Sequence, residues 1–117
     1  MNPHYMYPRQ RLFAAVQSLM VPVVSENAAI AGAMREVTLA LKDVTLPPEA
    51  DRHYLRIMAF MNGPGPWQQR AERLVRGQRA ELSLAVLELF CAVDLLYHKT
   101  TSSTVVILQD PPTNATG

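Results

Sequence analysis

The sequence predicts an all-α fold, a small bundle of four to five helices followed by a short C-terminal extended segment. Of its 117 residues, 49 % are hydrophobic, which is enough apolar material for the core of one domain. Apolar residues recur at the 3.6-residue helical period in several stretches. The strongest interruption is the Asn-Gly-Pro-Gly-Pro segment at 62–66, so we expect long helices separated by a few stiff turns.

Three regions are expected along the chain. Residues 1–8 contain two prolines and predict an extended N-terminal arm. Residues 9–99 are expected to form the helical bundle domain. Residues 100–117 are expected to hold a polar link, a short β-prone run at 105–108 and a disordered tail.

The first two helices are defined by proline and by capping residues. The first is expected at about 9–21, where Pro22 ends or kinks it. The second is expected at about 26–42, because Ser25 is a good N-cap and Glu26 complements the positive end of the helix dipole. The residues predicted to face inward are Leu12, Phe13, Val16, Leu19 and Met20 in the first helix, and Ile30, Met34, Val37 and Leu41 in the second.

The third and fourth helices both begin near a proline. Pro48 suits the first helical position, and the third helix is expected to run to about Met61. The fourth begins at Pro66 or Trp67, and its periodic pattern continues to residue 99. Gly77 is its one weak point, which leaves open one long helix or two with a bend there. In the third helix, Leu55, Met58 and Ala59 are predicted to face inward.

The stretch 82–97 is apolar on nearly every side, with only Ser83, Glu88 and Asp94 as polar residues. Such a helix must be surrounded by other chain. A single copy of this size is too small to enclose it, so we expect a homodimer. The expected dimer-interface residues are Leu84, Leu87, Phe90 and Leu95.

Four arginines recur at every third residue between positions 70 and 79, next to a tryptophan. On one helix they would form a slanting stripe about 13.5 Å long, each turned by about 60° from the last. One interpretation is a solvated face, with a Glu72–Arg76 pair and Arg79 bound to a neighbouring helix. Alternatively, they contact an acidic protein or the phosphates of a nucleic acid. The partner-binding candidates are Trp67, Arg70, Arg73, Arg76 and Arg79.

A second candidate site combines Cys91, Asp94 and His98, with Glu88 one turn earlier. Thiolate, imidazole and carboxylate are zinc ligands, and cysteine with histidine is also a nucleophile–base pair. However, side chains on one helix rarely converge on one atom across two turns, and no second Cys or His cluster completes a tetrahedral site. We therefore expect no metal, no cofactor and no catalysis, and an Asp94–His98 pair near the helix C-terminus.

Composition limits the function class. The net charge of +1 predicts no strong overall field. The single cysteine cannot form an internal disulfide, and no stretch reaches the ~20 apolar residues of a membrane span, so we expect an intracellular, cytoplasmic chain. The favoured function is a non-enzymatic interaction, adaptor or regulatory protein acting as a small helical homodimer. The alternatives are a nucleic-acid-binding accessory protein using the Arg70–Arg79 stripe, and a small viral or phage assembly component.

Overall fold

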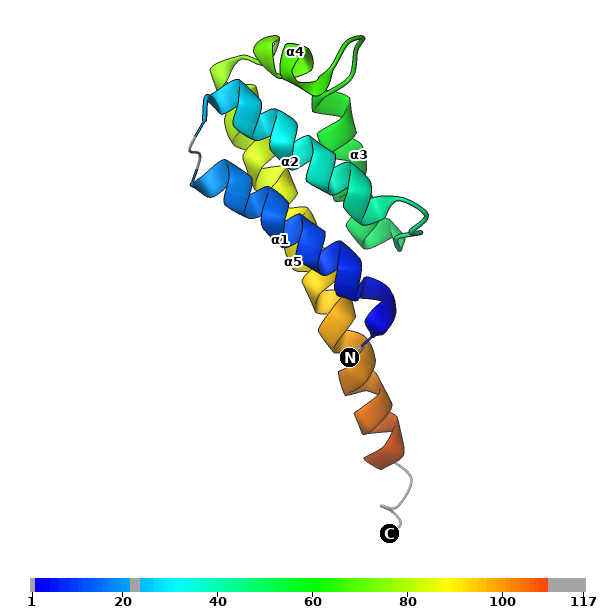
Figure 1. The fold of residues 1–117 in the computed structure, drawn as a ribbon. Coiled ribbons are helices and arrows are strands. Elements are labelled where there is room, and N and C mark those ends of the chain that lie inside the picture. Colours follow the sequence, from blue (N-terminus) through cyan, green and yellow to red (C-terminus); the bar gives the residue numbers. More distant parts are fainter. Residues whose placement is uncertain (1, 22–23, 110–117) are drawn as a thin grey trace.

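Helix α5 (Arg76–Gln109) is the longest helix and runs along the length of the bundle (Figure 1). The computed structural model describes residues 2–21 and 24–109, with side chains described as far as Lys99. The all-α bundle of four to five helices expected from the sequence is confirmed, with five α-helices among the described residues. Before α5 the chain forms a short 3-10 helix η1 (Pro3–Tyr5), then α1 (Met6–Met20), α2 (Glu26–Leu41), α3 (Pro48–Phe60) and α4 (Trp67–Glu72).

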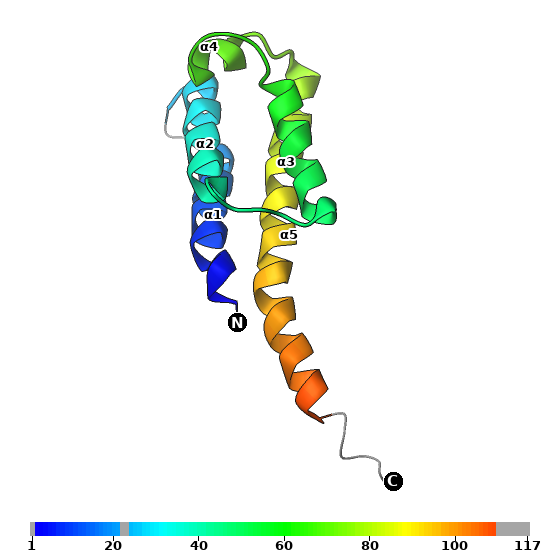
Figure 2. The ribbon, with the colours of Figure 1, turned by 90° about the vertical axis from the view of Figure 1, so that its right-hand side faces the viewer.

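The helices pack on two flanks of α5. Helices α1 and α2 form an antiparallel pair, and α1 contacts α5 (Figure 2). Helix α3 packs on another flank of α5. The short helix α4 crosses the end of the bundle and contacts α2. The connection through α4 therefore brings the chain from α3 back to the start of α5.

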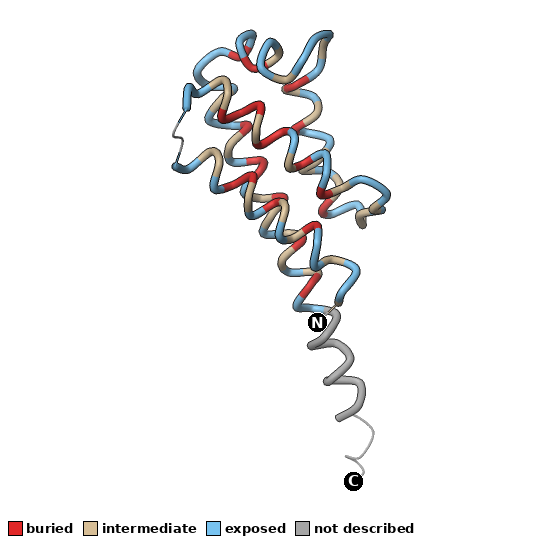
Figure 3. Tube along the Cα trace, viewed as in Figure 1, coloured by how far each residue is buried: buried red, intermediate tan, exposed pale blue. Residues whose placement is uncertain are grey.

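The core lies between α1, α2, α3 and α5, where the buried segments in Figure 3 face one another. Alanines at 15, 33 and 85 are fully buried and allow the helices to approach closely. Removing a large buried side chain here is expected to cost about 2–5 kcal/mol. The largest of these side chains are Leu12, Ile30, Met34, Val37, Ile57, Met61, Leu82, Val86, Leu89 and Val93.

The ends of the helices follow the expected capping chemistry. The hydroxyl of Ser25 accepts a hydrogen bond from the backbone N–H of Ala28 at 3.2 Å, which confirms it as the N-cap of α2. Pro48 occupies the first position of α3. In the turn between α3 and α4, Gly63 and Gly65 have φ angles of 123° and 95°, which side chains rarely tolerate.

The extended arm expected at the N-terminus is not formed. Residues 3–5 form η1, and α1 already begins at Met6. Pro8 lies in the first turn of α1, where its missing N–H leaves no helical hydrogen bond unmade. The backbone N–H of Asn2 donates to the carbonyl of Tyr97 at 3.1 Å, so this end of the chain is fixed to α5.

The polar link and the extended run expected near the C-terminus were also predicted wrongly. Helix α5 continues through residues 100–109, including 105–108. A helix satisfies its backbone hydrogen bonds locally, whereas a lone strand needs a partner strand, so local continuation outweighs the β-propensity of this run. The disordered tail expected at 111–117 lies outside the described residues.

For some residues, the prediction that they face the core was wrong, because the buried face of the helix points in another direction. Phe13 and Met20 of α1 are exposed, and so are Leu55 and Ala59 of α3. The side chains that face the core are instead Ala15 on α1, beside Leu12 and Val16, and Ala50 and Ile57 on α3. Hydrophobic period gives the spacing of a face but not its direction, and here small alanines occupy the closest helix contacts.

Candidate functional site

The four arginines between positions 70 and 79 lie on two helices and the connection between them. Arg70 belongs to α4, Arg73 is its C-cap, and Arg76 begins α5. The slanting stripe predicted for one continuous helix is therefore not formed. The break falls at residues 73–75, and Gly77 lies inside the first turn of α5, so neither a single helix nor a bend at Gly77 was correct.

Two interactions, one with the core and one within the chain nearby, explain why the helix breaks before Gly77. Leu74 is buried in the core cluster, which requires the chain to turn inward between α4 and α5. The side chain of Gln78 then accepts a hydrogen bond from the N–H of Val75 at 2.9 Å. This bond satisfies a backbone donor just before the first turn of α5, in the manner of a helix cap.

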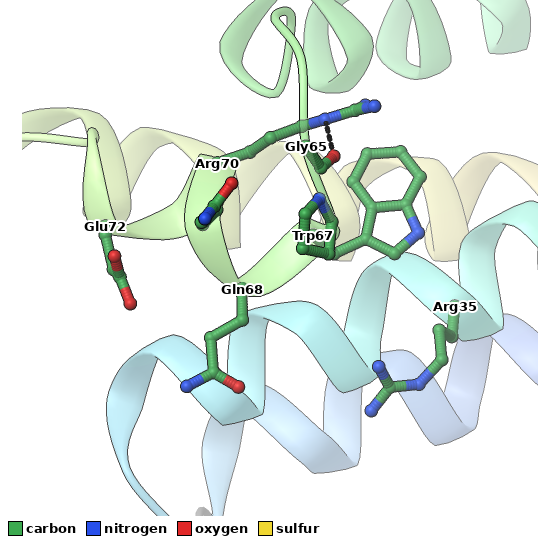
Figure 4. A pocket seen from close by; sticks show the side chains of 8 residues that line it. Arg35, Gly65, Trp67, Gln68, Arg70 and Glu72 are labelled. Atoms are coloured by element: carbon green, nitrogen blue, oxygen red, sulfur yellow. Dashed lines mark hydrogen bonds between the residues drawn. The ribbon is translucent and has the colours of Figure 1, made fainter.

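Arg70 and Arg73 hold the glycine–proline turn that precedes α4. Nε of Arg70 donates to the carbonyl of Gly65 at 2.8 Å (Figure 4), and Arg73 donates to the carbonyl of Pro64. The guanidinium of Arg70 also lies over the indole of Trp67, with Cζ 4.5 Å from the ring centroid. Guanidinium groups engaged in this way have fewer N–H donors left for the phosphate or carboxylate of a partner.

Arg79 fixes the break between α4 and α5. It donates from Nη2 to the carbonyl of Ala71 at 2.9 Å and from Nε to the carbonyl of Leu74 at 3.3 Å. Its Nη1 lies 2.9 Å from Oε1 of Glu26 on α2, close enough for an ion pair although not aligned as a hydrogen bond. The expected pairing of Arg79 with a neighbouring helix is confirmed. Within the described part of the chain, Arg76 makes neither a hydrogen bond nor an ion pair.

An open depression of about 650 Å³ lies beside Trp67, which is half-buried. Arg35 of α2 and Glu72 of α4 lie at its rim, with Gln68 between them (Figure 4). Because the charges of Arg35 and Glu72 are opposite, the rim does not select strongly for an anion. The predicted partner-binding residues therefore combine a turn-stabilising network with a shallow, mixed-polarity depression.

The predicted dimer-interface residues lie on the outer side of α5. Leu84, Leu87 and Leu95 are 50 %, 41 % and 62 % exposed. Phe90 is half-buried and meets Phe13 of α1, with ring centroids 5.7 Å apart. The stretch 82–97 is thus only partly covered by its own chain. Its inward side is formed by Leu82, Ala85, Val86, Leu89, Val93 and Tyr97.

A groove of about 350 Å³ runs between α1 and α5 beside these leucines, and its lining is apolar except for Ser83. A neighbouring depression of about 340 Å³ shares Leu19 and Ser83 with it and extends toward the start of α2. Met20, 72 % exposed, lines this groove from α1, and Phe13, 49 % exposed, lies earlier on α1, beside Phe90. The α1/α5 face is defined here as Phe13, Met20, Leu84, Leu87, Phe90 and Leu95.

The contribution of α1 to this face was missed in the sequence. Phe13 and Met20 are predicted to face inward because they follow Leu12 by one and by eight residues, which is one face of a 3.6-residue period. The signal that could have found them is the spacing of Met6, Phe13 and Met20, which are seven residues apart. Residues spaced by seven lie on one side of a helix. All three are exposed in the structure.

The carboxylates near Cys91 are engaged in separate interactions. Asp94 forms an ion pair with Arg9 of α1, and its Oδ1 lies 3.4 Å from Nε2 of His98. Glu88 instead lies 3.9 Å from both His53 and Arg56 of α3. Among the described residues, no group of three or more His, Cys, Asp or Glu side chains is placed to hold a metal ion.

Within the described residues, every helix is too short or too polar to cross a membrane. Comparisons with protein-family models, with curated proteins and with solved structures found no match to this chain.

Proposed function

We propose that this chain is a non-enzymatic interaction protein that acts as a small helical homodimer through the α1/α5 face. The observation that carries the proposal is the exposure of Leu84, Leu87 and Leu95 on a helix whose opposite side forms the core. The groove beside them adds concave apolar surface. Contiguous apolar surface of this kind is typical of protein–protein contact.

A second copy is the occupant that this surface favours. A self-complementary patch closes into a dimer, because the same surface serves both subunits. The arrangement of helices on two flanks of α5 leaves its outer side open along the apolar stretch. A further helix packed there would complete the surroundings that an apolar helix requires.

The nucleic-acid alternative has less support. Of the four arginines, Arg70, Arg73 and Arg79 donate to carbonyls of their own chain. Among these four arginines, and with respect to the described residues, Arg76 keeps its guanidinium free to bind a phosphate. A single phosphate contact gives weak binding whose affinity falls only slightly with salt concentration. An acidic protein partner would meet the same limitation.

A pair of matched substitutions tests the proposed homodimer. Leu87→Glu places a charge in the centre of the α1/α5 face and is expected to convert the protein to a monomer. Leu55→Glu places the same charge at another exposed leucine, 59 % exposed on α3, and is expected to leave the dimer intact. Light scattering gives the mass of each variant, and circular dichroism checks that both stay helical. Equal masses for the two variants would contradict the proposed interface.

A further inference from the structure

We infer that the second copy packs its α5 antiparallel to the first, about a two-fold axis that runs perpendicular to α5 and passes between Leu87 and Cys91. This inference rests on the proposed homodimer and specifies its geometry. It follows from the different chemistry of the two flanks of α5 and from the positions of its exposed residues.

The two flanks of α5 differ in polarity. On the α1 side, Phe90 meets Phe13 and the apolar groove begins at Ser83. On the α3 side, Glu88 lies 3.9 Å from Arg56. Glu88 and Phe90 point about 160° apart, because each residue turns an α-helix by 100°. The α1 flank is therefore apolar from Ser83 to Phe90 and carries the Asp94–Arg9 ion pair beyond it, whereas the α3 flank is charged at Glu81 and Glu88.

Symmetry then decides the orientation of the second copy. A two-fold axis perpendicular to α5 places each flank against the same flank of the other copy. The charged α3 flanks then meet each other, and on the α1 flanks the Asp94–Arg9 ion pair of one copy lies beside the apolar part of the other. A two-fold axis parallel to α5 would place the apolar flank of one copy on the charged flank of the other. That arrangement would desolvate Glu81, Glu88 and Arg56 against apolar side chains, which is costly.

The exposed residues of α5 define the register. Leu84, Leu87, Cys91 and Leu95 are exposed and follow one another at steps of three or four residues, so they form one stripe. An antiparallel copy centred on this stripe places Leu84 opposite Leu95 of the second copy, and Leu87 opposite Cys91. The small side chain of Cys91 next to the axis allows close approach of the two helices.

The charges at the two ends of the α3 flank agree with this register, while the two Glu88 side chains meet near the axis, each beside Arg56 of its own copy. Glu81 and Lys99 are eighteen residues apart, about five full turns, so they point to the same side of α5. Both are exposed. In the antiparallel register, Glu81 of each copy lies beside Lys99 of the other. The register that pairs these two residues differs by only one residue from the one that pairs Leu84 with Leu95. Two ion pairs related by symmetry would then close the charged edge of the interface.

A distance measurement tests the orientation. Spin labels are attached at Arg76→Cys in a Cys91→Ala background, because Arg76 is exposed and near one end of the helix. The antiparallel dimer places the two labels about 40 Å apart along α5, whereas a parallel dimer keeps them near the roughly 8–10 Å interhelical distance. A dimer with the short distance would overturn this inference alone. A protein with the mass of one chain and no dipolar coupling between spin labels would overturn the homodimer itself.

A charge exchange tests the register in protein that keeps Cys91. Glu81→Lys and Lys99→Glu, each alone, are expected to weaken the dimer roughly three- to tenfold, since each replaces two attractions by two repulsions. The double variant is expected to restore most of the wild-type affinity, since the ion pair of Glu81 with Arg56 in its own chain stays lost. Lys42→Glu, at an exposed lysine after α2, is the control and is expected to leave it unchanged. The register would be wrong if the two single variants weaken the dimer and the double variant does not restore it. It would also be wrong if neither single variant has an effect.

Discussion

Phe13 of α1 and Phe90 of α5 meet with ring centroids 5.7 Å apart and ring planes tilted by 42°. Phe90 is half-buried, while Phe13 keeps about half of its surface exposed. Tilted aromatic pairs add about 0.5–1.5 kcal/mol to the stabilisation that burial provides. The pair therefore connects the packing of α1 on α5 with the apolar surface available to a second copy.

The neighbouring residues Leu12 and Phe13 are expected to separate folding from association. Leu12 is fully buried, so Leu12→Ala should lower the free energy of unfolding by about 2–5 kcal/mol. Phe13→Ala should lower it by only about 1 kcal/mol but should weaken the dimer. Urea unfolding in a Leu87→Glu background gives the stability of the monomer, and light scattering of the single variants gives the association. Stronger destabilisation by Phe13→Ala than by Leu12→Ala would contradict the described burial.

Arg79 and Arg76 form a second matched pair. Arg79, whose side chain is 19 % exposed, donates to two carbonyls at the break between α4 and α5. Lysine cannot reproduce this planar fork, so Arg79→Lys should cost about 1–2 kcal/mol of unfolding free energy. Arg76→Lys should change it by less than about 0.5 kcal/mol, as is usual at exposed sites. Equal effects of the two substitutions in thermal unfolding would argue against a structural role for Arg79.

Gly63 and Gly77 are expected to respond in opposite directions to alanine. Gly63 has a φ angle of 123°, and an added Cβ would lie 3.3 Å from the Arg73 guanidinium, so Gly63→Ala should destabilise by about 1–3 kcal/mol. Gly77 lies in α5 with nothing within 4 Å of the added Cβ. Gly77→Ala should therefore stabilise by about 0.5–1 kcal/mol. Chemical denaturation measures both, and a stable Gly63→Ala protein would contradict the turn geometry.

The helices could be predicted from the sequence because their signals are local. Ser25 and Pro48 marked the starts of α2 and α3, and the segment 62–66 marked the turn before α4. The break at 73–75 could not be predicted, because it depends on the burial of Leu74 and on the carbonyl bonds of Arg79. The burial of Leu74 is a tertiary interaction, and Arg79 reaches these carbonyls only once the helix is broken, so no local pattern records either.

The candidate site was predictable only in part, for a related reason. Leu84, Leu87 and Leu95 could be predicted because the stretch 82–97 is apolar on nearly every side. One small chain cannot cover all sides of such a helix, so part of it stays exposed. Phe13 and Met20 were missed because the sequence does not fix the rotation of α1 about its axis. For the arginines, the sequence leaves open a solvated face or a partner-binding set, because the carbonyls that they bind become neighbours only in the folded chain.

Sedimentation equilibrium of the wild-type protein tests the homodimer most directly. One chain has a mass of 13.0 kDa. We predict that the weight-average mass rises toward twice this value as the concentration increases through the micromolar range, because the α1/α5 face associates by mass action. A constant mass of 13.0 kDa across that range would show that the exposed leucines of α5 remain in water, and the proposed function would be wrong.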